Sequence, residues 1–254
     1  MKGVFRTWLV LSWKELRSYF FSPLGYVVMA LVLAMFGVSY RFALDGMAGK
    51  VSQFSLVYLT FNSFWFWMIY FLVFPLITMK SFAEERRSGT AEQLFTAPVT
   101  AWEVVLGKFS AALVFYLAIW APTMINFVAF ELWSGSSSAY APGGFWGTYL
   151  IRFLVGTMNL AMGIFASSLT ASQVIAGVLG FCLVTLHFFM GFSHQLGTRI
   201  SADLMERVRY FSTFEHFRTF SQGLIDSRAV VYYLSMAALF LVFTQAVVDS
   251  RRWR

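Results

Sequence analysis

Charged residues are scarce in this sequence. Asp, Glu, Lys and Arg make up 12% of the 254 residues, whereas 59% of the residues are apolar and 20% are aromatic. In a soluble domain about a quarter of the residues are charged, because the surface must face water. The shortage of charge excludes an ordinary water-soluble protein and indicates that lipid surrounds much of the chain.

Cysteine is almost absent as well. The single cysteine, Cys182, lies within an apolar run, so an intramolecular disulfide is excluded. The formal net charge is +7, which in a soluble protein would suggest a nucleic-acid partner. Lysine and arginine beside apolar segments instead orient a protein in a bilayer. We therefore expect membrane lipid, and no nucleic acid, as a partner.

A nucleotide-binding loop is also missing. Such a loop needs glycines followed by a Lys–Ser/Thr pair, so that backbone N–H groups surround the phosphates. Gly–Lys pairs occur at Gly49–Lys50 and Gly107–Lys108, and neither is followed by Ser or Thr. We expect no ATPase site, no cofactor and no catalytic residue in this chain.

Long apolar runs are what the sequence does contain. A helix needs about 20 apolar residues to cross a bilayer, and runs of that kind cover residues 23–44, 56–79, 103–130, 146–170, 173–192 and 229–248. Asn62 and Pro75 predict irregularities in the second run, and Thr170 to Ser172 predicts a tight turn between the fourth and fifth. We expect one all-α integral membrane domain, residues 1–254, with six membrane-spanning helices.

Six spans place both termini on the same side. Most basic residues flank the spans on that side, which predicts a multi-pass protein with both termini in the cytoplasm. The arginines between the last two spans weaken this bias: they are Arg199, Arg207, Arg209, Arg218 and Arg228.

Two flanking segments have amphipathic patterns. Residues 1–22 place Val4, Trp8, Leu11 and Phe20 among basic side chains, which predicts an interfacial helix before Pro23. The alternative is a basic flank that only sets topology. The first apolar run is too long for a signal peptide, so we expect it to be retained. Residues 192–228 carry two helical repeats of apolar residues, which predict two short outer helices that re-enter toward the bilayer.

The segment from Lys80 to Lys108 concentrates charge between the second and third spans. Gly89 is expected to break the helix that leaves the membrane. Thr90 with Gln93 and Thr100 with Glu103 form two capping-box patterns, and Pro98 ends the short helix between them. This helix carries Leu94 and Phe95 on an otherwise polar element. The pattern alone fits either a docking surface for another protein or a loop packed against its own bundle.

This segment resembles the coupling region of ABC-2-type transporter permeases, especially the gliding-motility (GldF-like) group. The matching residues are Pro75, Ser81, Phe82, Ala83, Glu84, Glu85, Gly89, Thr90, Glu92, Leu94, Pro98, Trp102, Gly107 and Lys108. Further similarity lies in Lys14, Glu15, Leu16, Ser18, Phe20 and Pro23 to Tyr26, and in Phe217 to Asp226. Gln93 and Ala97 stand where members often have leucine or lysine.

The resemblance implies the permease subunit of an ABC exporter in a bacterial inner membrane. It implies two copies of a separate ABC ATPase, which would hold ATP and Mg, and a second permease copy or a related permease. The implied coupling region is 84–98, with Glu84, Glu85, Arg86, Arg87, Gly89, Thr90, Glu92, Gln93, Leu94, Phe95 and Pro98. In it, Glu84 and Glu85 would contact basic residues or helix ends at the subunit boundary, and Leu94 with Phe95 would be the apolar plug.

The fourth span has a polar and small face. Its members, at spacings of 4, 3, 4 and 4, are Arg152, Gly156, Asn159, Gly163 and Ser167. Such a face fits first a packing seam between spans, because Gly and Ser mostly pack helices in membranes, and the alternative is a pathway wall or dimer face. We expect Arg152 to lie near the outer interface, where its long side chain can reach water.

Two other functional classes compete with a permease. A channel or membrane scaffold would have no ATPase partner, and no span carries the carboxylate cluster of a channel. An intramembrane hydrolase could use Ser193, but His187 and His194 lie on the same span or at its end, so their geometry as a base is poor. The two histidines have no neighbouring carboxylate, so we expect no metal site.

Overall fold

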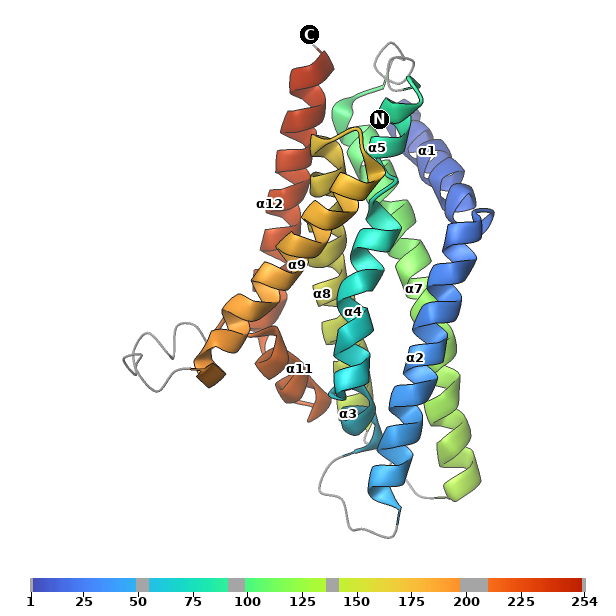
Figure 1. Cartoon of the computed structure of the whole chain (residues 1–254), viewed down its shortest axis with the longest axis vertical. Helices are drawn as coiled ribbons and strands as arrows, with labels where there is room; N and C mark the ends of the chain where they lie inside the picture. The colour runs from blue at the N-terminus through green and yellow to red at the C-terminus, as the bar shows by residue number, and fades with distance from the viewer. Residues whose placement is uncertain (1, 49–54, 91–98, 136–141, 197–209, 253–254) are drawn as a thin grey trace.

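Helices account for all regular structure in the described part of the chain. The computed structural model describes residues 2–48, 55–90, 99–135, 142–196 and 210–252, and these contain no strand. Figure 1 shows a bundle whose two termini lie at the same end, as an even number of crossings requires. The all-α prediction is confirmed.

Four helices are long and apolar enough to cross a membrane. They are α2 (Pro23–Met47), α7 (Ala101–Ser134), α8 (Pro142–Leu169) and α12 (Ser227–Arg252). Two shorter apolar helices run beside them, α4 (Phe64–Thr78) and residues 173–189 of α9 (Gln173–Leu196). Each of the six predicted runs therefore contains helix, while four of them satisfy the length and composition of a span.

The second predicted run is not one helix. It consists of α3 (Leu56–Phe61) and α4, which are separated at Asn62 and Ser63. The Ser63 hydroxyl accepts a hydrogen bond from the Phe66 N–H at 3.2 Å and so caps α4. The irregularity expected at Asn62 is thus a complete interruption, because the polar pair offers the backbone an alternative to helical hydrogen bonds.

The predicted boundaries of α2, α7 and α9 have clear local causes. Pro23 occupies the first turn of α2, where its missing N–H costs nothing. At the start of α7 the Thr100 N–H donates to Glu103 Oε2 at 2.7 Å and the Glu103 N–H donates to Thr100 Oγ1 at 3.3 Å. This confirms the second capping box. The turn at residues 170–172 separates α8 from α9 as expected.

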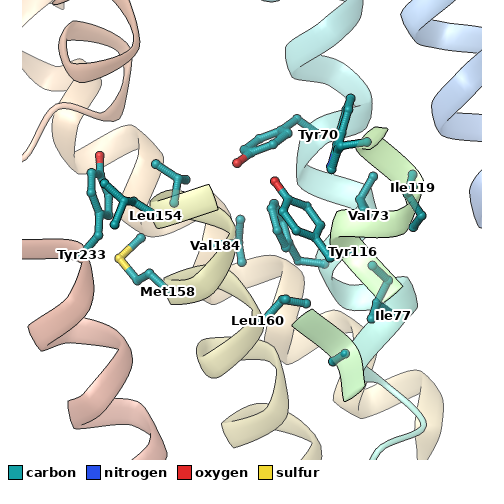
Figure 2. Close-up of a cluster of buried hydrophobic side chains, with 14 of the residues drawn as sticks. Tyr70, Val73, Ile77, Tyr116, Ile119, Leu154, Met158, Leu160, Val184 and Tyr233 are labelled. Carbon is teal, nitrogen blue, oxygen red and sulfur yellow. The ribbon is translucent and has the colours of Figure 1, made fainter. Parts of the chain in front are cut away.

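Helix α8 lies at the centre of the bundle. It contacts α4, α7, α9, α11 (Thr213–Ser221) and α12. In its apolar window 83% of the residues are buried, against 28% in α2 and 22% in α12. Figure 2 shows Leu154, Met158 and Leu160 of α8 among side chains of α4, α7, α9 and α12. Helix α8 is therefore the element through which most of the other helices are joined.

Both flanking segments contain helices. Residues 2–20 form α1 (Lys2–Phe20), which packs against α7. Its Leu11 side chain lies close to Gly107, and the hydroxyls of Ser12 and Ser110 are 2.9 Å apart. In the segment 192–228, α11 corresponds to the second of the two expected helices, and the first falls largely on residues outside the described part of the chain.

Candidate functional site

The charged connection after α4 begins with a short helix, α5 (Ala83–Arg87). The chain leaves α4 at Thr78, turns through residues 79–82 and enters α5 at the end of the bundle that holds both termini (Figure 1). The helix from the membrane thus stops earlier than expected. Gly89 follows α5 with φ of 72°, a left-handed conformation that favours glycine.

The remainder of the coupling region is described only in part. Glu84, Arg87, Gly89 and Thr90 are exposed. The Thr90 hydroxyl lies 2.9 Å from Ser88 Oγ and donates to the Glu85 carbonyl at 3.3 Å. The residues predicted as the projecting helix and its capping box lie outside the described residues: Glu92, Gln93, Leu94, Phe95 and Pro98.

A charged triad joins α5 to two other helices. Lys108 Nζ of α7 lies 2.8 Å from Glu85 Oε1 of α5 and 2.9 Å from Glu15 Oε1 of α1. The Lys108 side chain is only 4% exposed. A buried ammonium is tolerated when carboxylates compensate it, and removal of one partner of a buried pair costs about 3–5 kcal/mol. The triad therefore resists separation of α1, α5 and α7.

Ser167 attaches α5 to the end of α8. Its hydroxyl accepts hydrogen bonds from the N–H groups of Phe82 at 3.0 Å and Ala83 at 3.2 Å, and it donates to the Met79 carbonyl at 3.2 Å. One donor and two acceptor positions are all that a serine hydroxyl has. The first turn of α5 is thus capped by a side chain from another helix.

Two arginines bind the last carbonyls of α8. Arg86 of α5 donates to the Ser168 carbonyl, and Arg251 of α12 donates to the Leu169 carbonyl at 3.1 Å. Cations at this position complement the negative end of a helix dipole. Partial burial and the nearby Arg251 lower the pKa of Arg86 to about 10, so Arg86 stays charged at neutral pH.

Open space lies beside the triad. A cavity of about 540 Å³ separates parts of α1, α2 and α4, and its wall includes Glu15, Lys80, Glu84 and Lys108. Glu15 of α1 and Glu85 of α5 therefore both pair with Lys108 of α7 at the edge of this cavity. Glu85 is engaged within the chain, where the resemblance implied a contact with a neighbouring subunit, while Glu84 remains exposed.

The α8 face predicted from spacing is buried along its whole length. A Cβ at Gly156 would overlap the Tyr116 ring, and a Cβ at Gly163 would overlap the Thr78 side chain. Asn159 is 3% exposed. These contacts are those of a packing seam between α8, α4 and α7. A role of this face as a pathway wall or dimer face stays a prediction.

The Arg152 side chain does not reach water, which corrects the expectation that it would. The residue is 1% exposed. Its guanidinium carbon lies 3.6 Å from the centre of the Phe61 ring and 4.0 Å from that of Trp120, with Phe66 at 5.1 Å and Tyr149 at 5.3 Å. These rings come from α3, α4, α7 and α8. They attract the side chain inward because each aromatic face binds a cation with about 0.5–2 kcal/mol.

The two histidines with described side chains bond to neighbouring tyrosines of α12. His187 Nε2 lies 2.8 Å from the Tyr232 hydroxyl, and His216 Nδ1 lies 2.8 Å from that of Tyr233. Among the described residues no three His, Cys, Asp or Glu side chains are grouped as metal ligands. The side chains of Ser193 and His194 lie outside the described part.

Sequence reasoning did not connect Lys108, Glu15 and Ser167 into one site. A signal was present, because Lys108 is the only basic residue between Thr100 and Gly135 and Glu15 is the only acidic residue before Pro23. A lone cation in an apolar helix needs a counter-charge. The sequence could not say which of the nearby carboxylates provides it.

Comparison with known proteins gives the family. The model of the ABC-2 family transporter protein matches residues 9–248. The "Probable multidrug ABC transporter permease YbhR" of Escherichia coli strain K12, and its counterpart in Escherichia coli O157:H7, are each 29% identical over 119 residues. That match covers 42% of this chain and 28% of the relative's length. The chain therefore belongs to the ABC-2 transporter family, as a multi-pass membrane component of an ABC transporter.

Proposed function

We propose that this chain is the permease of an ATP-driven exporter in a bacterial inner membrane, with both termini in the cytoplasm. The residues from 84 to 98 receive a separate ABC ATPase, present in two copies, and a second permease completes the assembly. ATP and Mg bind to the ATPase. Family membership and the resemblance to the GldF-like group support this proposal.

The observation that carries the proposal is the attachment of α5 to the bundle. The pairing of Glu85 with Lys108 connects α5 to α7 and, through Glu15, to α1. The bonds of Ser167 and Arg86 connect α5 to α8. A force on the segment that follows α5 would therefore reach three helices at once.

Elementary energetics indicate how such a force would travel. Separation of α5 from Lys108 would expose an uncompensated buried charge, and separation from Ser167 would leave buried N–H groups without acceptors. It costs less free energy to move these elements together as one unit, which consists of α1, α5, α7 and the end of α8. In this mechanism nucleotide-driven closure of the ATPases displaces the unit, and the cavity beside it provides space for the displacement.

Substitution of the predicted docking residue tests the proposal. In Leu94→Asp we expect copurification of the ATPase from membranes to fall about tenfold, while the amount of inserted permease is unchanged. Leu132→Asp is the matched control, because Leu132 is an 81% exposed leucine at the far end of α7. Undiminished association in Leu94→Asp would favour the second candidate, a membrane scaffold or channel without an ATPase.

A further inference from the structure

Arg152 has no counter-charge in the described part of the chain. No described carboxylate forms an ion pair with it, and its Nε and both terminal nitrogens have no hydrogen-bond acceptor. The amide oxygens of Asn62 and Asn159 are also without partners, but neither bonds to Arg152. An ionisable residue within a membrane-spanning helix that is not paired points to a functional site.

Its polar neighbours do not supply the missing acceptors. The Tyr116 hydroxyl donates to the Arg152 carbonyl at 3.2 Å, so it bonds to the backbone of Arg152 and not to the guanidinium. It also interacts with the Tyr70 hydroxyl and with the indole N–H of Trp120, whose ring lies 4.0 Å from the guanidinium carbon. Figure 2 shows the hydroxyl groups of Tyr70 and Tyr116 pointing toward one another. The guanidinium nitrogens therefore have no acceptor among the described residues, and an oxyanion would supply one.

Aromatic rings alone do not satisfy this arginine. The Phe61 and Trp120 rings are at stacking distance and bind the charge through their faces, but ring faces leave the N–H groups at the edge of a guanidinium without acceptors. A guanidinium that contacts only ring faces keeps its N–H edge available for a two-pronged contact with a phosphate or carboxylate, because its planar fork matches the oxygens of such groups.

A cavity lies against the same residues. Its volume is about 210 Å³, and its lining includes Trp120, Tyr149 and Arg152 together with Leu117, Ala121 and Phe153. Leu117 and Ala121 are exposed on the outside of α7. The cavity is smaller than the roughly 300–1,000 Å³ of a pocket for a drug-sized ligand. The cavity therefore suits the head group of an amphiphile, whose apolar part would lie along the exposed surface of α7.

The depth of the site favours a ligand in passage. Arg152 lies about 15 Å along α8 from Pro142 and about 25 Å from Leu169 at 1.5 Å per residue, so it is far from both ends of a helix that would cross a hydrocarbon layer about 30 Å thick. The head groups of resident lipids stay at the surface. A free anion would have to pass the apolar residues at the exposed side of the cavity, Leu117 and Ala121, whereas an amphiphile carries an apolar part that can contact them.

From these observations we infer that Arg152, Trp120 and the adjoining cavity bind the phosphate or carboxylate group of an anionic amphiphile. The inference rests on the proposed function in one respect, since it names the chemical class of the cargo. Arg152 would hold the anionic group, and Trp120 would add a hydrogen bond from its indole N–H.

The test is a binding titration with the full chain in nanodiscs of phosphatidylcholine and no ATPase. Dihexanoyl phosphatidic acid is compared with uncharged dihexanoylglycerol and with inorganic phosphate, and the thermal unfolding midpoint reports binding. Of the three compounds, we expect only the phosphatidic acid to raise the unfolding midpoint saturably. An equal rise with dihexanoylglycerol would overturn the anion site, and an equal affinity for inorganic phosphate would overturn the amphiphile as its ligand.

Variants identify the residue. Arg152→Lys keeps the charge but loses the planar fork of the guanidinium, so its Kd for dihexanoyl phosphatidic acid should rise about tenfold. In Arg152→Met the unfolding midpoint should show no saturable rise with this lipid. Without ligand, Arg152→Met should unfold at the same temperature as wild type or higher, because the cost of the unpaired buried charge exceeds the gain from its contacts with the rings. A purely structural arginine predicts the opposite shift. Arg41→Met is the control, because Arg41 is exposed and pairs with Asp45.

The result of this binding test can be distinguished from the result of the ATPase-docking test. Leu94→Asp should bind phosphatidic acid as tightly as wild type, because the variant leaves Arg152, Trp120 and the other described residues that line the cavity unchanged. Unchanged binding in Arg152→Met, or in Arg152→Lys if Arg152→Met does not fold, would overturn the inference while ATPase docking through Leu94 stood.

Discussion

Glu85 Oε1 and Lys108 Nζ are 2.8 Å apart, although 23 residues and the whole predicted coupling helix separate them in sequence. The ion pair closes the base of the segment that would project toward an ATPase. Both ends of that segment are thereby fixed to each other and to Glu15 of α1. A helix that transmits force needs such a fixed base, because a flexible one would absorb the displacement.

Lys108→Met should uncouple the permease without removing its ATPase. Glu15 and Glu85 would face each other without a cation, so we expect a loss of about 1–3 kcal/mol of stability, less than for a fully buried pair because both carboxylates are partly exposed. ATPase copurification should persist while activity of the assembled complex falls at least tenfold. Lys80→Met is the control, since Lys80 lines the same cavity and forms no ion pair with a described residue. Equal losses in both variants would contradict a specific role of the triad.

Ser167→Ala should weaken the attachment of α5 to α8. The N–H groups of Phe82 and Ala83 would lose their acceptor in a buried environment, which costs about 1–3 kcal/mol. Ser168→Ala provides the matched control, because the Ser168 hydroxyl bonds only to the Phe165 carbonyl of its own helix at 2.7 Å. Thermal unfolding of both variants in detergent measures the difference, and equal midpoints would show that the Ser167 bonds are dispensable.

Gly163→Ala should disturb the contact between α8 and α4. The added methyl group would overlap the Thr78 side chain, whose hydroxyl already bonds to the Phe74 carbonyl at 2.8 Å, and overpacking of this kind costs about 1–3 kcal/mol. Gly180→Ala is the comparison, because its nearest neighbour would lie 3.7 Å away at ordinary contact distance. Thermal midpoints of the two variants should differ by several degrees, and a tolerant Gly163 would mean that α4 can shift away from α8.

Protonation of His216 should destabilise the packing of α11 against α12. Burial lowers the pKa of His216 below its usual value of 6.5, although the charges of Asp226 and Glu215 oppose this. The unfolded chain then binds a proton more readily than the folded chain, so the contribution of His216 to stability is present above pH 6.5. It is lost as the pH falls from about 6.5 toward the lowered pKa.

The difference in thermal midpoint between wild type and His216→Gln isolates this contribution. It should be largest at pH 7.5 and shrink by pH 5.5, because the bond between neutral His216 and the Tyr233 hydroxyl is weakened on protonation when the ring nitrogen acts as its acceptor. A difference that stays constant between these pH values would assign the histidine a packing role only.

The sequence predicted helices better than it predicted their junctions. Apolar runs and the capping signal of Thr100 with Glu103 depend on neighbours in sequence; the runs are largely helical and this capping box was confirmed. The interruption at Asn62 was anticipated only as an irregularity, since the strength of a cap at Ser63 depends on backbone geometry. Family resemblance pointed to residues 84–98, but the projecting part lies outside the described residues.

Arg152 shows why the site itself could not be read from spacing. Its position on α8 was consistent with a side chain that reaches the interface. The rings that draw it inward come from three other helices as well as its own, and no local pattern specifies their convergence. The same limit applies to Lys108, whose partners lie 93 and 23 residues away in sequence.

The enclosure of α8 also restricts how two permeases can meet. Because its neighbours surround it, a second copy would have to touch the outward faces of other helices unless the bundle opened. Helix α9 offers such a face, with Val174, Ile175, Val178 and Leu179 exposed near its start. Cysteines introduced there would report on pairing between subunits, whereas cysteines on α8 would report on rearrangement within one subunit.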